Sequence, residues 1–300
     1  MVSNLQILLQ APIFSVQLLI DGLLVGAIFA LVAYGMALVW GVMNIINVAQ
    51  GELVMLGGYV TLLLYYAGWS PFLGIPAAAI VMYLVGWALY RAVIWRVVDR
   101  DLFISLLATF GLSILIQQLA NQVFGANVET ARSGLGTISL FGGSVTVAEI
   151  KLVTFVAAFV VAGAMVAFLK YARLGQAIRA TAQNARAARI LGVDTQRVYA
   201  TTFALNAAIC GAAGALVAMT WIIHPYLGLA YTVRSFMIVV VAGLGNLAGV
   251  IVAGLGLGVA ETFAGFILGA EAQTAFVFSL LVVILVIRSL ILHRQRKVLR

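Results

Sequence analysis

The sequence predicts an all-α, polytopic membrane protein, and three features predict this class. Of the 300 residues, 64% are hydrophobic and only 9% are charged, whereas soluble domains contain about 25% charged residues. The mean hydropathy of +1.16 leaves too few polar groups to cover a water-facing surface of this size. Apolar runs of about 20 residues, the length that crosses a bilayer, recur along the whole chain. These features exclude a soluble enzyme, a disordered tail and a nucleic-acid-binding protein.

Eight hydrophobic segments are expected to lie in the membrane, within a single domain over residues 1–300. The segments cover residues 15–40, 42–66, 71–95, 103–124, 147–170, 198–222, 232–268 and 272–292. Segment 232–268 is too long for one simple pass, so we expect two short passes, or one pass and a re-entrant piece, and eight to ten passes in all. The first Lys or Arg is Arg91, so the start of the chain lacks the basic region of a cleaved signal peptide.

The basic residues predict the orientation. Most of the 17 Lys and Arg residues fall into three stretches: Arg91, Arg96 and Arg100; Lys170, Arg173, Arg179, Arg186, Arg189 and Arg197; and Arg288, Arg294, Arg296, Lys297 and Arg300. The positive-inside rule places all three stretches in the cytoplasm. The C-terminus is therefore expected inside. Three segments precede Arg91, which puts the N-terminus outside.

Two polar interruptions inside apolar segments are expected to mark a solute path. A broken helix in lipid costs several kcal/mol per freed backbone group unless protein or a cavity surrounds it. The first break runs from Gly41 to Glu52 and the second from Gly243 to Gly249. The candidate path residues are Asn44, Asn47, Gln50, Gly51 and Glu52 in the first break, and Gly245 and Asn246 in the second. One break in each half of the chain is typical of transporters built from related halves, with half-helices near the bilayer midplane. These side chains either cap the broken helices or contact a passing solute. A half-helix starting near Gly51 would suit a carboxylate, and Glu52 could meet an ammonium.

Other residues in the spans indicate packing or function. The pairs Gly22/Gly26, Gly245/Gly249, Gly254/Gly258 and Gly265/Gly269 have the spacing that brings helix backbones close together. Asp21 and Glu261 are further carboxylates in or beside apolar spans, without an obvious local partner. Each is a candidate functional residue, and a structural role at a subunit seam is the alternative.

The polar stretch 170–197 predicts a cytoplasmic helix. From Arg173 to Leu191 the chain is rich in Ala, Arg, Gln and Leu without proline, and Gly192 stands where a C-terminal cap belongs. Such a helix fits two functions equally well. It could dock a partner protein, or it could lie as a basic amphipathic helix on anionic lipid headgroups.

No catalytic or energy-converting motif accompanies this helix. None of the three lysines precedes Ser or Thr, so the Gly-Lys-Ser/Thr of a phosphate-binding loop cannot form, and ATP, if used, is bound by another polypeptide. His224 and His293 are far apart, and Cys210 is the single cysteine, so no metal site is expected. We therefore expect neither an enzyme nor a cofactor.

The residues of the breaks and of the polar stretch carry a family resemblance. The sequence resembles the LivH-type permease subunits of branched-chain amino acid ABC importers over nearly its whole length. The matching pieces are Tyr34 to Leu38, Val42 to Glu52, Met55 to Tyr59, Leu174 to Val193, Phe203 to Gly214 and Val241 to Gly258. The Asn-x-Ala-x-Gly-Glu element and the polar stretch are its most specific parts.

The resemblance implies an inner-membrane subunit with several partners. It would pair with a second related permease, dock two ATP-binding subunits through the cytoplasmic loop, and receive a small-molecule substrate from a periplasmic binding protein. This favours the docking interpretation of the polar stretch. The implied docking positions are Gly175, Arg179, Ala180, Asn184, Ala188 and Gly192.

Two departures from the family pattern leave the substrate open. Gln50 stands where many relatives have histidine, and residues 287–290 lack the usual Arg-Pro-x-Gly-Leu. An importer of urea or short-chain amides is therefore an alternative. An ion-coupled secondary transporter that uses Asp21, Glu52 or Glu261 is a rival from another class, and a passive channel is a further one.

Overall fold

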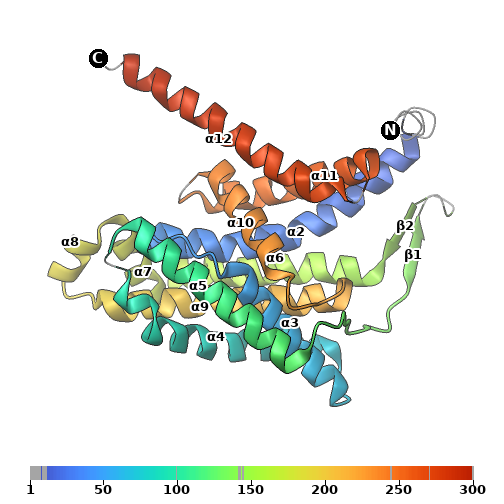
Figure 1. Cartoon of the computed structure of the whole chain (residues 1–300), viewed down its shortest axis with the longest axis horizontal. Helices are drawn as coiled ribbons and strands as arrows, with labels where there is room; N and C mark the ends of the chain where they lie inside the picture. The colour runs from blue at the N-terminus through green and yellow to red at the C-terminus, as the bar shows by residue number, and fades with distance from the viewer. Residues whose placement is uncertain are drawn as a thin grey trace.

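The computed structural model of the chain describes residues 8, 12–98, 100–140, 143, 145–243, 245–269 and 271–298, with the backbone alone at 12, 140 and 288–298. The side chains of His293 and of the basic residues from Arg288 to Arg300 are outside the part that the structure describes. Within the described part, helices run back and forth between two ends of an elongated bundle (Figure 1). Six of them are long and apolar enough to cross a membrane, and two shorter apolar helices accompany them. The predicted all-α, multi-pass class is confirmed.

The observed helices follow the predicted segments closely. In chain order they are α2 (Pro12–Met43), α3 (Gln50–Tyr66), α4 (Gly74–Ala92), α5 (Leu102–Phe124), α6 (Glu149–Tyr171), α7 (Arg173–Gln183), α8 (Ala185–Ile190), α9 (Thr195–Thr220), α10 (Gly228–Ala242), α11 (Leu247–Leu268) and α12 (Ala272–Val298). Two 3-10 turns, Pro71–Leu73 and Ile94–Arg96, flank α4. Segment 232–268 is divided between α10 and α11, as its length required.

Helices α2 and α9 form the core of the bundle. In each, the most apolar stretch of 18 residues is almost wholly buried, whereas only a minority of the corresponding residues in α4, α5, α6 and α11 are buried, as in lipid-facing helices. Glycines allow α2 and α11 to approach closely: a Cβ at Gly26 would lie 2.8 Å from the carbonyl oxygen of Gly254. Gly22 of α2 likewise faces Gly258 and Val259 of α11. The packing interpretation of these glycine pairs therefore holds for α2 and α11.

The two ends of the bundle differ in structure. One end carries α7, α8, the end of α4 and the start of α9, and the hydroxyl of Tyr90 donates to Gln196 Oε1 at 3.4 Å across it. The opposite end carries an antiparallel hairpin that the sequence did not predict, β1 (Thr137–Leu140) and β2 (Val145–Ala148), with Thr137 paired to Ala148. Gln17 of α2 binds the backbone N–H and C=O of Thr146 in β2, both at 2.8 Å.

The predicted single helix from Arg173 to Leu191 is wrong, because Asn184 divides it into α7 and α8. Asn184 adopts an extended backbone, and its Oδ1 accepts a hydrogen bond from the N–H of Ala187 at 2.9 Å. Asparagine favours such N-cap positions because it satisfies an N–H that the helix leaves unpaired. Gly192, with φ of +87°, follows the end of α8 as a left-handed cap residue.

Candidate functional site

The first predicted break separates α2 from α3. Asn44 has a φ of +52°, and its N–H donates to the carbonyl of Trp40 at 3.0 Å, so α2 ends there with an exposed left-handed residue. Residues 44–47 have no regular structure, and α3 begins at Gln50. The break is therefore real, and its polar groups need partners from other helices.

Gln50 ties the start of α3 to both central helices. Its Nε2 donates to the carbonyl oxygen of Val32 in α2 and to Oδ1 of Asn206 in α9, each at 2.9 Å. Its Oε1 accepts from Nδ2 of Asn47 at 3.2 Å. Gln50 and Asn47 are both fully buried. In this conformation these two side chains support the bundle, as the capping interpretation expects.

Two threonines satisfy the backbone that the break leaves free. Thr109 of α5 accepts from the N–H of Val48 at 3.2 Å and donates to the carbonyl of Ile46 at 3.0 Å. Thr232 of α10 accepts from the N–H of Gly51 at 2.9 Å and donates to the carbonyl of Val48 at 3.0 Å. Side chains of α5 and α10 thus provide what water would provide outside the membrane.

Glu52 lies where the first turns of α3 and α10 meet. It is 1% exposed, and its Oε1 accepts a hydrogen bond from Ser113 of α5 at 3.1 Å. Its carboxylate packs on Gly228, the first residue of α10, so closely that any side chain at position 228 would collide with it. The positive ends of two helix dipoles therefore face one buried carboxylate. We call this meeting point of α2, α3, α5, α9 and α10 the junction.

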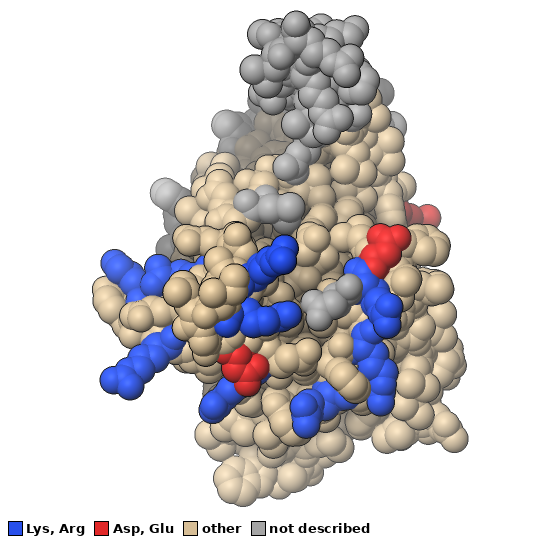
Figure 2. Space-filling model, turned by 90° about the vertical axis from the view of Figure 1, so that its left-hand side faces the viewer, with Lys and Arg blue, Asp and Glu red and all other residues tan. Residues whose placement is uncertain are grey.

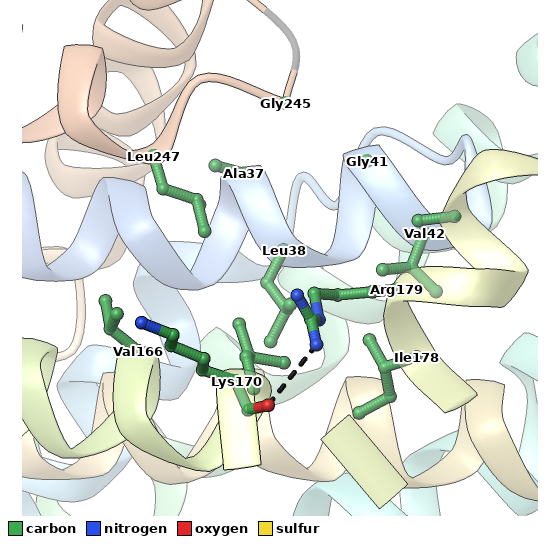
Figure 3. Close-up of a pocket in the computed structure, with 12 residues that line it drawn as sticks. Ala37, Leu38, Gly41, Val42, Val166, Lys170, Ile178, Arg179, Gly245 and Leu247 are labelled. Carbon is green, nitrogen blue, oxygen red and sulfur yellow. Dashed lines mark hydrogen bonds between the residues drawn. The ribbon is translucent and has the colours of Figure 1, made fainter. Parts of the chain in front are cut away.

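The second predicted break does not lie at the junction. Gly243 and Gly245 have φ values of +83° and +82°, and Asn246 caps α11 by accepting from the N–H of Gly249 at 2.9 Å. Gly245 lines a cavity together with Lys170 and Arg179 of the α7 end (Figure 3). The second break is therefore a turn at that end of the bundle. Residues 221–227, between α9 and α10, are also non-helical; Ile223 packs on Gly58 of α3, and Gly228 follows beside Glu52.

The cavity beside Gly245 has a volume of about 380 Å³ and lies between α2, α6, α7 and the start of α11. Apolar side chains line most of it, and Lys170 and Arg179 supply its charge. The guanidinium of Arg179 is turned towards α6, where its Nη2 donates to the carbonyl of Lys170 at 3.3 Å (Figure 3). Arg179 therefore faces this cavity.

The predicted docking positions divide into buried and exposed ones. Gly175 and Ala188 are buried in the chain itself, and a Cβ at Gly175 would lie 2.6 Å from the Cα of Leu169 in α6. Ala180, Asn184 and Gly192 are exposed. Gly175 thus holds α7 against α6, and the exposed positions form the outer surface of α7 and α8.

The tip of α8 exposes apolar side chains beyond the membrane-spanning helices. Ile190 and Leu191 are 80% and 84% exposed, although they lie among arginines rather than on a lipid-facing span. Figure 2 views this end of the molecule, where Lys and Arg side chains gather around few acidic ones. The exposed basic side chains come from Arg91, Arg96, Arg100, Lys170, Arg173, Arg179, Arg186, Arg189 and Arg197. We call this surface the basic end.

The carboxylates that lack an obvious partner in the sequence are both paired in the structure. Lys151 Nζ lies 2.6 Å from Asp21 Oδ1. Arg234 of α10 binds both carboxylate oxygens of Glu261 in α11, with Nε 2.9 Å from Oε2. Neither partner is local in the chain: Asp21 meets Lys151 130 residues away, and Glu261 meets Arg234 27 residues away. Arg234 and Glu261 also line a second cavity, of about 340 Å³.

Sequence reasoning missed the residues that complete the junction. Ser105, Thr109 and Ser113 recur at every fourth position and are buried on one face of α5. Such a polar stripe in an apolar span is a signal that could have been found, because positions four apart share a helix face. Thr202, Asn206 and Cys210 form the equivalent buried stripe in α9.

A multi-pass bundle whose broken helices meet at a buried polar junction, with an exposed basic helix pair at one end, defines a transport permease. The family described as "Branched-chain amino acid transport system / permease component" matches residues 18–287, and the chain belongs to that family. It is thus the non-catalytic membrane component of a transport system, and a multi-pass membrane protein.

Curated relatives agree with this assignment. The chain is 29% identical over 295 residues to the high-affinity branched-chain amino acid transport system permease protein LivH of Escherichia coli K12, covering 92% of this chain and 94% of the relative. It is 31% identical over 297 residues to LivH of Salmonella typhimurium, with the same coverage. It is 30% identical over 286 residues to BraD of Pseudomonas aeruginosa, covering 91% and 93%. Among solved structures, PsaBC from Streptococcus pneumoniae in complex with Fab shares the fold, with a TM-score of 0.52 and 12% identity over 95% of each chain.

Proposed function

We propose that this chain is the pore subunit of an ABC importer that moves branched-chain amino acids across a bacterial inner membrane. A second related permease completes the pore, two ATP-binding subunits drive it, and a periplasmic binding protein delivers the solute. The names of the relatives in three bacteria support the solute class. The observation that carries the proposal is the basic end with the bare tip of α8, Ile190 and Leu191.

The tip of α8 is the docking site for an ATP-binding subunit. Exposed aliphatic side chains on a membrane span face lipid, but Ile190 and Leu191 lie beyond the spans and among charged residues. An exposed apolar contact with a polar rim is typical of a protein interface. Ala180, Asn184 and Gly192 extend this surface along α7 and α8. Gly175 acts beneath it by fixing α7 on α6.

Movement of the docked subunits drives alternating access through the junction. α7 packs on α6, α2 and α9, and α2 ends in the break that starts α3. A displacement at the basic end is therefore transmitted through packed helices to the point where Gly51 and Glu52 meet α10. Asn44 and Gly245, which are exposed, border the path on the side of the basic end, and Glu52 acts at its centre.

The orientation follows from the charge. Under the positive-inside rule, we place the basic end in the cytoplasm. We place the C-terminus on the same side, and the direction of α12, which runs back towards the basic end in Figure 1, supports this. We place the N-terminus outside, and the start of α2 at the hairpin end supports this (Figure 1).

A reconstitution experiment tests the proposal. The chain is co-expressed with the permease, ATP-binding subunits and binding protein encoded beside it, and ATP-dependent uptake of L-leucine into proteoliposomes is measured. The double variant Ile190→Glu/Leu191→Glu is expected to lose co-purification of the ATP-binding subunits and uptake. Val128→Glu, at an exposed apolar position (60%) distant in sequence from the basic end, is the matched control.

The outcomes separate the candidate functions. Undiminished co-purification and uptake in the double variant would overturn the docking site. Uptake that survives without ATP and stops with an uncoupler would favour ion coupling, and competition by urea or acetamide rather than by valine would favour the amide importer.

A further inference from the structure

The second cavity contains a charged pair inside the membrane-spanning part of the chain. α2, α10, α11, the start of α12 and residues 221–227 surround a volume of about 340 Å³, within the size range of small-molecule sites. Arg234 and Glu261 line it and are 14% and 4% exposed in their side chains. An ion pair in a membrane span is costly to bury and is a functional candidate by default.

The pair keeps hydrogen-bonding capacity on both partners. Arg234 uses Nε and Nη2 for Glu261 and donates from Nη1 to the carbonyl of Ala230 at 3.1 Å. A guanidinium has five N–H groups, so within the described residues one N–H remains on each of Nη1 and Nη2. Glu261 Oε2 accepts one hydrogen bond, from Nε, and can accept a second. The cavity thus presents two donors for a carboxylate and an acceptor for an ammonium.

The rest of the lining is mostly apolar. Val25, Phe29, Trp221, Ile222, Leu227 and Ala230 line the same volume, together with Tyr231 and the polar side chains of His224, Thr262 and Gln273. Arg234 also lies over the ring of Phe29, 5.1 Å from its centroid, which holds the guanidinium in place beside these side chains. A charged pair at one wall and an otherwise mostly aliphatic and aromatic lining match a zwitterion that carries an apolar side chain.

We infer that this cavity is a transit site for an α-amino acid with an apolar side chain, whose carboxylate binds Arg234 and whose ammonium binds Glu261. The inference rests on the proposed import function and names where this chain recognises the solute. The site is connected to the junction through α10, because Gly228 at the start of that helix touches Glu52 and Arg234 lies less than two turns further on. Occupancy of the cavity therefore acts on the helix that closes the junction.

The test measures ligand binding to the assembled transporter without its binding protein. The permease and ATP-binding subunits in nanodiscs are titrated with L-leucine, with leucinamide, which lacks the carboxylate, and with 4-methylpentanoate, which lacks the amine. Tryptophan fluorescence reports binding, and Trp221→Phe shows whether the signal comes from the cavity. The wild type is expected to bind leucine about 10- to 100-fold more tightly than either analogue, since each lacks charge-assisted hydrogen bonds.

Two double variants separate recognition from stability. Arg234→Gln/Glu261→Gln keeps hydrogen-bonding groups and removes both charges together, so no single charge is left buried. It is expected to bind all three ligands equally weakly. Asp21→Asn/Lys151→Gln removes the other ion pair and is expected to bind like the wild type.

Either of two results overturns the site: equal binding of leucine and both analogues by the wild type, or unchanged leucine binding by Arg234→Gln/Glu261→Gln. If that variant fails to assemble, two measurements still test the site. They are the relative affinities of the wild type for the three ligands and the fluorescence signal of Trp221→Phe. If the complete importer takes up leucine but the binding assay shows no difference between leucine and its two analogues, the transit site is refuted and the proposed function stands. Absence of any ATP-dependent leucine uptake would refute the proposed function.

Discussion

A methyl group at Gly51 is expected to force α3 and α10 apart. A Cβ at this position would overlap the carbonyl group of Gly228, which belongs to a helix backbone and cannot rotate away. Overpacking costs about 1–3 kcal/mol, and a backbone obstacle favours the upper end. The better helix propensity of alanine returns up to about 1 kcal/mol. We expect Gly51→Ala to destabilise the chain by about 2 kcal/mol and to weaken the hydrogen bond from Gly51 to Thr232.

Thermal unfolding of the purified importer and its leucine uptake check this prediction. Gly163→Ala is the matched control, because Gly163 also lies in a membrane helix and a Cβ there meets no atom within 4 Å. The control should unfold at or above the wild-type temperature, and Gly51→Ala clearly below it, with reduced uptake. If Gly51→Ala matches the control in both measurements, the close approach of α3 and α10 does not constrain the junction.

Three further substitutions test other contacts. Ser113→Ala removes a hydrogen bond to the buried carboxylate of Glu52 and should cost about 1.5–3 kcal/mol in thermal or denaturant unfolding; wild-type stability would show that Glu52 does not depend on it. Gly258→Leu should disrupt the α2–α11 contact and reduce folded protein recovered from the membrane, whereas Gly256→Leu on the same helix meets nothing within 4 Å and should be tolerated; equal recovery would contradict the packing argument. Asn184→Ala removes the α8 cap, at a cost of about 0.5–2 kcal/mol to that helix, and should weaken co-purification of the ATP-binding subunits; unaltered retention under salt washing would speak against it.

The sequence predicted the helices and both breaks because lipid imposes strict rules on them. Apolar length determines which segments can span, so segment 198–222 lies within three residues of α9, Thr195–Thr220, at each end. Polar residues within such segments indicate a break because unpaired backbone is costly there. Asn44 directly follows the last residue of α2, and Gly243 directly follows the last residue of α10.

The partners across the junction could not be predicted from one sequence. Helical periodicity shows that Thr109 and Ser113 share a face of α5, but it does not show which helix that face meets. The contact of Glu52 with Gly228 and the pairing of Arg234 with Glu261 depend on how the helices are assembled in three dimensions. The division of α7 from α8 was missed for a local reason: the composition favoured a helix throughout, and the N-cap chemistry of Asn184 prevailed.

The exposed aliphatic pair Ile190 and Leu191 also affects the turnover of the protein in the cell. If ATP-binding subunits cover this pair as proposed, a copy made in excess of them exposes both side chains to water, where chaperones and proteases recognise uncovered apolar surface. Orphan copies should therefore be degraded faster than assembled ones. The abundance of the permease would then follow the supply of its motor subunits, without any separate regulator.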